Sequence, residues 1–160
     1  MSRIHLRRTL LAAAVFGFAA PLVSTAAMAG ECPAGKVAPN AMTGGATAPK
    51  DVTDNVIASI DLGQGYGVEG RLLRTRRLVV QPGGIVPLHS HAERPANIYI
   101  VEGAITEYRS TCAVPIEHKA GDVTAESGNL SHWWKNNGTK PAILISSDIV
   151  PAPMKDTGGM

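Results

Sequence analysis

Short apolar stretches rich in β-branched residues, separated by glycine and proline, dominate the chain from residue 51 onward. Such stretches are typical of β-strands. Beyond the N-terminus no window shows sustained helical periodicity, and the sequence has no evident internal repeat. About eight strands in one small unit predict an all-β sandwich or closed barrel. The expected strands are residues 56–62, 72–81, 85–91, 97–102, 105–109, 122–126, 131–135 and 142–149.

One connection in this pattern carries a specific turn signal. Asn136, Asn137 and Gly138 stand between the last two expected strands. An Asn-Gly pair tolerates the positive φ values of a type I′ turn, which favours a tight hairpin. The pattern therefore predicts that the strands on either side of these residues pair with each other.

Residues 1–29 have the features of an export signal. A basic start that includes Arg7 and Arg8 precedes an apolar run, and small residues before Gly30 suit a cleavage site. The run is too short to span a bilayer, and Pro21 interrupts it. The arginine pair also fits a loose twin-arginine pattern, so both the Sec and the Tat routes stay open. We expect a periplasmic or secreted protein with no membrane attachment after cleavage.

The remaining chain is one domain in size and has no strong charge. Without the three arginines of the signal, 12 basic residues stand against 13 acidic ones. No basic stripe indicates nucleic-acid binding, and no second apolar span indicates a membrane. We expect a flexible N-terminal arm at residues 30–50, where Gly, Ala and Pro are frequent, and a β-barrel domain at residues 51–160.

Two cysteines remain after the signal, Cys32 and Cys112. In an oxidising compartment one disulfide between them is the favoured state, and it would join the N-terminal arm to a loop in the middle of the chain. The alternatives are two unpaired thiols, or Cys112 as a metal ligand.

Three histidines occur in short β-like segments bounded by glycine. His89 and His91 are two residues apart, so on an extended strand their side chains leave the same face. His132 lies 41 residues after His91, and a folded sheet could bring it alongside. Three neutral imidazoles suit one divalent ion of Fe, Zn, Cu, Ni or Mn. The alternative is a barrel that keeps the three as hydrogen-bonded core residues.

The same segments resemble the two sequence motifs of the cupin superfamily. The resemblance covers roughly residues 70–150 and implies a jelly-roll barrel with a metal inside one mouth, held by the three histidines. It also implies a possible homodimer. Because cupins include enzymes, storage proteins and sensors, the resemblance favours a fold more strongly than an activity. The matching residues are Gly84, His89, His91 and Gly103 in the first motif, and Gly121, Asp122, His132 and Asn136 in the second.

The chain departs from that family at one ligand position. The carboxylate that completes the family's metal site falls on Ala96 here. Three imidazoles alone would leave the charge of the metal to be compensated by water, hydroxide or an anionic ligand. Glu93 continues the alternation of His89 and His91 and is a possible substitute. The Arg94-Pro95 pair favours a turn, however, so Glu93 is more readily a solvent-exposed carboxylate paired with Arg94.

The surroundings of the histidines predict a mostly apolar pocket. Alternation from His132 places Trp134 on the same face, although both tryptophans could equally be packing residues. Ala96, Ile98 and Ile100 would share the inner face and add to an apolar wall. His118 stands in a polar stretch and is expected at the surface. No residue stands out as a general base. An enzyme of this kind would perform metal-dependent oxygenation, or lyase or isomerase chemistry, on a small organic molecule. The alternatives are a non-catalytic binder of metal or of a small chelating ligand, and a purely structural barrel.

Overall fold

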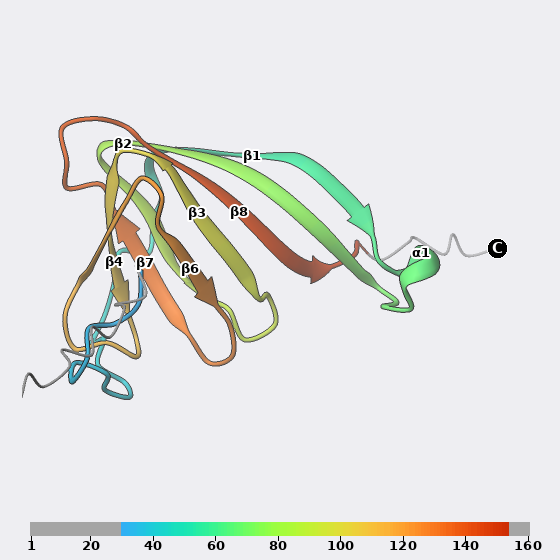
Figure 1. The fold of residues 1–160 in the computed structure, drawn as a ribbon, viewed down its shortest axis with the longest axis horizontal. Coiled ribbons are helices and arrows are strands. Elements are labelled where there is room, and N and C mark those ends of the chain that lie inside the picture. Colours follow the sequence, from blue (N-terminus) through green and yellow to red (C-terminus); the bar gives the residue numbers. More distant parts are fainter. Residues whose placement is uncertain (1–29, 154–160) are drawn as a thin grey trace, which may run out of the picture.

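The computed structural model describes residues 30–153, so the predicted export signal lies outside the described residues. Eight strands form one antiparallel sheet that curls into a half-barrel (Figure 1). The all-β fold predicted from the sequence is therefore confirmed. The elements are β1 (Lys50–Asp61), a short helical turn α1 (Gly63–Tyr66), β2 (Arg71–Ser90), β3 (Ala96–Glu102), β4 (Ala104–Arg109), β5 (Ile116–Lys119), β6 (Val123–Glu126), β7 (Ser131–Lys135) and β8 (Ala142–Pro151).

Strand β2 lies in the middle of the sheet and pairs with strands on both sides of it. The strands follow one another in space as β5-β4-β7-β2-β8-β3-β6, with β1 also paired to β2. Residues 71–80 of β2 pair with β8, and residues 85–90 pair with β7. In Figure 1 the part of β2 that lies between β1 and β8 extends away from the curled part of the sheet as a long ribbon. Within residues 30–153 no helix has the length and apolar character needed to cross a bilayer.

The two strands expected at residues 72–81 and 85–91 are one continuous strand. The intervening Pro82-Gly83-Gly84 segment remains in the ladder because Gly83 donates its N–H to Asn136 O, and Asn136 donates its own to Gly84 O. A side chain at Gly84 does not fit there, since an added Cβ would lie 2.8 Å from Asp51 O of β1. The backbones approach too closely for any residue but glycine.

The predicted hairpin at Asn136-Asn137-Gly138 is wrong. Strands β7 and β8 do not pair with each other, because β2 lies between them in the described sheet. The Asn136 side chain organises the connection in another way. Its Nδ2 donates to Val80 O and Lys140 O, at 2.8 Å each, and its Oδ1 accepts from the Gly138 N–H at 2.9 Å. Neither Asn137 nor Gly138 adopts the positive φ of a type I′ turn. The chain bends here, and tertiary pairing decided which strands the connection joins.

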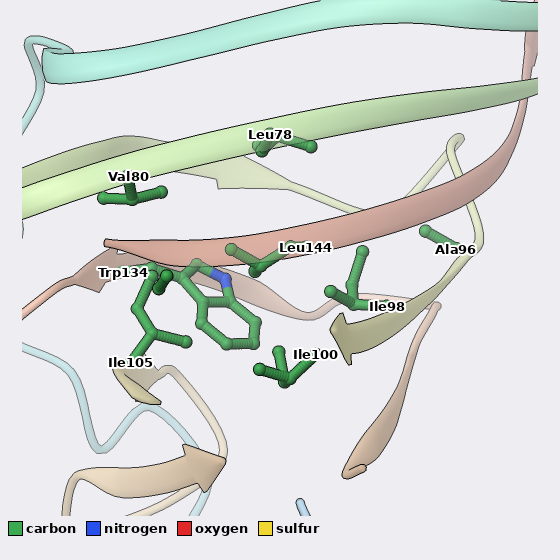
Figure 2. Close-up of a cluster of buried hydrophobic side chains, with 9 residues drawn as sticks. Leu78, Val80, Ala96, Ile98, Ile100, Ile105, Trp134 and Leu144 are labelled. Atoms are coloured by element: carbon green, nitrogen blue, oxygen red, sulfur yellow. The ribbon is translucent and has the colours of Figure 1, made fainter. Parts of the chain in front are cut away.

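The core lies inside the curl of the sheet. Alternation in β3 buries Ile98 and Ile100 while Asn97 and Tyr99 between them are exposed, as expected for a strand with one buried face. Figure 2 shows the Trp134 indole among the aliphatic side chains of this core. The core consists of Leu78, Val80, Ala96, Ile98, Ile100, Ile105, Trp134, Ala142 and Leu144.

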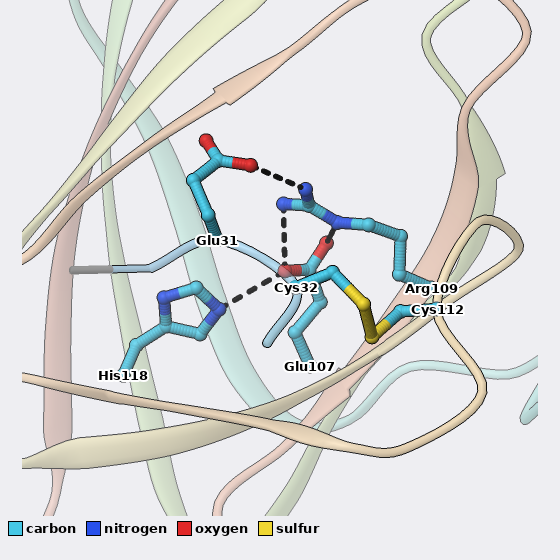
Figure 3. Close-up of a disulfide and its surroundings, with 6 residues drawn as sticks. All are labelled: Glu31, Cys32, Glu107, Arg109, Cys112 and His118. Atoms are coloured by element: carbon cyan, nitrogen blue, oxygen red, sulfur yellow. Dashed lines mark hydrogen bonds and ion pairs between the residues drawn. A yellow bond between two sulfur atoms is a disulfide. The ribbon is translucent and has the colours of Figure 1, made fainter. Parts of the chain in front are cut away.

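The N-terminal arm follows an irregular path that is fastened to the loop after β4. Val37 forms an isolated antiparallel bridge with Cys112, and the Ala113 N–H donates to Lys36 O at 2.8 Å. The predicted disulfide between Cys32 and Cys112 is present, with the two Cα atoms 5.7 Å apart (Figure 3). The domain boundary that we place at residue 50 stays a prediction, although β1 begins there.

Removing the disulfide is expected to destabilise the fold. The bond joins residues 80 apart in the sequence, and closing so long a loop contributes about 2–4 kcal/mol, mainly by restricting the unfolded chain. We expect the Cys32→Ser/Cys112→Ser variant to lose that much unfolding free energy in urea titrations. The reduced wild-type protein is the matched control and should show the same loss. Two reactive thiols in the unreduced wild-type protein would contradict the bond.

Candidate metal centre

Three histidines, two on adjacent strands and one directly after a strand, meet at the inner face of the sheet. His89 in β2 and His132 in β7 are direct partners in the antiparallel register, and their Nε2 atoms lie 3.1 Å apart. His91 follows the end of β2, and its Nε2 lies 3.0 Å from His132 Nε2. Two nitrogens that bind one cation at about 2.1 Å are roughly 3.0–3.4 Å apart in octahedral or tetrahedral geometry. The predicted convergence of the three side chains is therefore observed, and their spacing is compatible with a metal ion.

The other ring nitrogens determine where the protons are. His89 Nδ1 lies 2.8 Å from Pro87 O, and His91 Nδ1 lies 2.7 Å from Arg94 O. A carbonyl oxygen can only accept, so both Nδ1 atoms carry a hydrogen, and in the neutral rings both Nε2 atoms present a lone pair. The imidazoles of His89 and His91 are thus held in the tautomer that a metal requires.

A carboxylate orients the third imidazole in the same way. His132 Nδ1 lies 2.5 Å from Glu107 Oε1, whereas the Trp134 indole N–H is 3.2 Å from the same nitrogen. The shorter contact, to a charged acceptor, decides that Nδ1 donates its hydrogen to Glu107. All three Nε2 lone pairs therefore point toward one another, an arrangement that is repulsive without a cation.

Glu107 is the centre of a buried charged network on β4 (Figure 3). Arg109 donates to both of its oxygens, from Nε at 2.8 Å and from Nη2 at 2.9 Å, and His118 Nε2 lies 3.0 Å from Oε2. Burial opposes ionisation of Glu107, but hydrogen bonds from His118, His132 and Arg109 outweigh it and hold the pKa of this carboxyl well below its usual range. Glu107 is therefore a fixed anion behind His132.

The predicted surface position of His118 is wrong. Its side chain is fully buried, because alternation in β5 turns Ile116 and His118 inward and leaves the residues between and after them exposed. Glu107 itself was missed from the sequence. The signal was present, since Glu107 and Arg109 alternate with Ile105 in an expected strand and so share its buried face.

A second buried acidic residue, Asp148 on β8, pairs with arginines, one of which, Arg76, lines the cavity beside the histidines. Arg74 binds it through two hydrogen bonds of 3.0 and 2.8 Å, and Arg76 Nε lies 3.3 Å from Oδ2. Burial raises the pKa of Asp148, but the bonds and charges of Arg74 and Arg76 prevail and lower it. Nothing in the sequence pattern singled out this residue, because it forms its pairs across strands far apart in the chain.

A cavity of about 210 Å³ opens beside His89 and His91. Trp134 lines it together with Leu78, Val86, Pro87, Ile98 and Leu144, and the charged residues Asp54, Arg76, Arg94 and Glu126 line it as well. Ala96 is buried in the apolar core. Glu93 is exposed beyond the end of β2, and neither cluster of side chains able to hold a metal includes it. Those clusters, among the described residues, are His89, His91 and His132, and Glu107, Glu126 and His132.

Comparison with known proteins agrees with this arrangement. The family model of the cupin domain matches residues 76–148, which span the strands that carry the three histidines. This part of the chain is a cupin domain. The fold of the cupin domain of Schizosaccharomyces pombe Cnp3 aligns with 64% of the chain and 63% of that protein, at a TM-score of 0.50 and 12% identity. The predicted cupin fold is thus confirmed.

Curated plant proteins are similar to the cupin domain in sequence. An auxin-binding protein, ABP19b, of Prunus persica is 32% identical over 96 residues, which cover 54% of this chain and 43% of the relative. Germin-like protein 5-1 of Oryza sativa subsp. japonica is 34% identical over 76 residues, which cover 44% and 33%. The chain thus spans less than half the length of these relatives.

Replacing Glu107 with glutamine is expected to weaken metal binding. The amide keeps the shape of the side chain but removes the charge that fixes the His132 tautomer, and loss of such a partner typically reduces metal affinity about 10–100-fold. Titration of the apo-protein with Zn²⁺ or Co²⁺ measures the effect. Glu102→Gln, on the exposed end of β3, is the matched control. Equal affinities in the two variants would contradict the role of Glu107.

The metal-free protein is expected to lose stability as the pH falls below about 6.5. Burial, assisted by the neighbouring His132, lowers the pKa of His89 to about 3 from an ordinary 6.5. Between these values the unfolded chain binds a proton that the folded protein does not, so stability is complete above 6.5 and declines toward 3. The unfolding equilibrium constant should change by up to about tenfold per pH unit. Urea titrations with a chelator, at pH 7, 6 and 5, measure this slope.

The matched comparison is the same titration of His89→Gln. A glutamine cannot take up the proton, so the slope should decrease by up to one proton per molecule. Identical slopes in the wild-type protein and the variant would show that His89 does not contribute.

Proposed function

We propose that this cupin domain binds one divalent metal ion through the Nε2 atoms of His89, His91 and His132. The observation that carries the proposal is the direction of the three lone pairs. Each Nδ1 donates to an oxygen, and the Nε2 atoms of His91 and His89 lie 3.0 and 3.1 Å from His132 Nε2. Imidazole sets of this kind suit Fe, Zn, Cu, Ni or Mn.

We further propose that the bound metal acts on a small organic molecule in the adjacent cavity. The metal would supply Lewis acidity or oxygen activation, as in an oxygenase or in a lyase or isomerase. The chain would contribute orientation and exclusion of water. Trp134 and the aliphatic lining residues give the cavity an apolar part, and the volume of about 210 Å³ restricts the substrate to a small molecule.

One cationic residue of the cavity wall, Arg94, is available to an anionic group of a substrate. Arg76 is already paired with Asp54 and Asp148, but Arg94 lines the cavity with only a long contact, 3.7 Å from Asp148. Its guanidinium is therefore the cationic group most available to a bound molecule.

A non-catalytic binder of metal or of a small chelating ligand is the second candidate function. One observation favours it: the polar groups of the cavity wall are mostly engaged with one another. Arg76 contacts Asp54 and also donates to Ser146 Oγ at 3.2 Å. Proton transfer in an enzyme requires a group that is free to exchange a proton with the substrate.

We propose an exported, periplasmic or secreted location for the protein. The disulfide between Cys32 and Cys112 supports it, because such bonds persist in oxidising compartments. The basic and apolar N-terminal sequence is the second support.

Metal analysis of protein purified from its native compartment tests the proposal. We expect about one equivalent of a transition metal per chain in the wild-type protein, and loss of that metal from the His89→Ala/His91→Ala/His132→Ala variant. Circular dichroism and thermal unfolding establish that the variant is folded. Wild-type protein that takes up no stoichiometric metal, even after incubation with each candidate ion, would overturn the proposal.

Turnover assays then separate the enzyme from the binder. Oxygen uptake by the metal-loaded protein is measured with a panel of small thiols, catechols and carboxylates, and NMR follows conversion without oxygen. Consumption that requires the three histidines supports an enzyme. Binding of a panel member without conversion supports the second candidate.

A further inference from the structure

A buried carboxylate on β6 lies beside the histidine cluster. Glu126 is 2% exposed, its Oε2 lies 3.0 Å from His91 Nε2, and its Oε1 lies 3.5 Å from His132 Nδ1. Oε1 has no hydrogen-bond partner among the described residues. A buried carboxylate oxygen without a partner is destabilising unless a cation lies beside it. We infer that Glu126 is a fourth protein ligand of the metal, which replaces from a neighbouring strand the carboxylate that Ala96 lacks. The inference rests on the proposed function.

The hydrogen bonds of His91 show why a cation belongs between the two groups. Its Nδ1 donates to Arg94 O, so in the neutral imidazole Nε2 presents a lone pair to Glu126 Oε2 at 3.0 Å. Two lone pairs at that distance repel each other. The same Nε2 lies 3.0 Å from His132 Nε2, which also presents a lone pair. A single cation that accepts all three lone pairs removes both repulsions.

The strand register places Glu126 where it can replace a carboxylate at residue 96. Ala96 of β3 and Glu126 of β6 are direct partners in the antiparallel ladder. Direct partners project side chains from the same face of a sheet, with Cβ atoms about 4.5–5.5 Å apart. Both residues are buried on the inner face, so the two methylene groups of Glu126 span the short distance across the strands. Glu126 thus supplies a carboxylate from the strand next to Ala96, at the same site.

The other buried carboxylates near the cluster are already committed. Asp148 of β8 is the partner of Ala96 on its other side, but its oxygens are taken by Arg74 and Arg76. Both oxygens of Glu107 accept hydrogen bonds from Arg109, and His132 and His118 share them. Glu126 is the carboxylate whose charge remains available. Its coordination would compensate part of the dipositive charge and leave positions open for a substrate.

Co²⁺ titration of the metal-free protein tests this assignment. We expect Glu126→Gln to raise the Kd for Co²⁺ at least about tenfold, the lower limit for losing even an outer partner of a metal site. The visible spectrum of bound Co²⁺ should also change, because it reports the number and type of ligands. Glu93→Gln, an exposed glutamate near the same histidines, is the matched control and should change neither reading.

A relocation variant keeps the test decisive if Glu126→Gln does not fold. Glu126→Ala removes the carboxylate, and Ala96→Glu in the same chain restores one at its cross-strand partner. We expect the double variant to regain Co²⁺ affinity to within about tenfold of the wild-type value, the smallest loss expected for a disturbed metal site. Failure to regain it overturns the assignment in that case.

The outcomes separate this assignment from the proposed function. Unchanged affinity in Glu126→Gln, or weaker affinity with an unchanged Co²⁺ spectrum, overturns Glu126 as a ligand while the three-histidine site stands. Absence of Co²⁺ binding by the wild-type protein overturns both.

Discussion

The register between β2 and β7 is the constraint on which the centre depends. It sets His89 directly opposite His132, and a bulge in the preceding ladder, between Val86 and His89, adjusts the pairing just before this point. Because side chains alternate between faces, a slip of one residue would turn His132 to the opposite face of the sheet, away from His89 and His91. The carbonyls of Pro87 and Arg94 then orient the rings, so the backbone on either side of the histidines prepares them for a cation.

Buried charge is the second feature of this small sheet. Two of the buried carboxylates, Glu107 and Asp148, are held ionised in the interior, where removal from water is unfavourable unless good partners replace it. Each is held by at least one arginine through paired hydrogen bonds. The network of Glu107 continues outward through Arg109 to Glu31, next to Cys32 in the arm (Figure 3). The disulfide, the arm and the orientation of His132 are therefore linked through β4.

Much of the fold could be predicted from the sequence because strand formation has a local signature. Alternation, glycine and β-branched residues located the strands and placed His89 and His91 on one face. Three predictions failed for a common reason. The hairpin at Asn136, the break near Pro82 and the exposure of His118 all depended on which strands become neighbours, and that choice is made by packing across long sequence separations.

The sequence by itself determined the chemistry that is available: three imidazoles in cupin spacing, a disulfide-forming cysteine pair, and a methyl group where the family has a carboxylate. Only the tertiary structure decided which carboxylates reach the imidazoles. Glu107 of β4 approaches His132 because β4 pairs directly with β7, whereas Glu126 of β6 approaches His91 because the sheet curls. Sequence spacing describes neighbours along one strand, whereas contacts across a curled sheet arise from register and curvature, which depend on the whole set of strands.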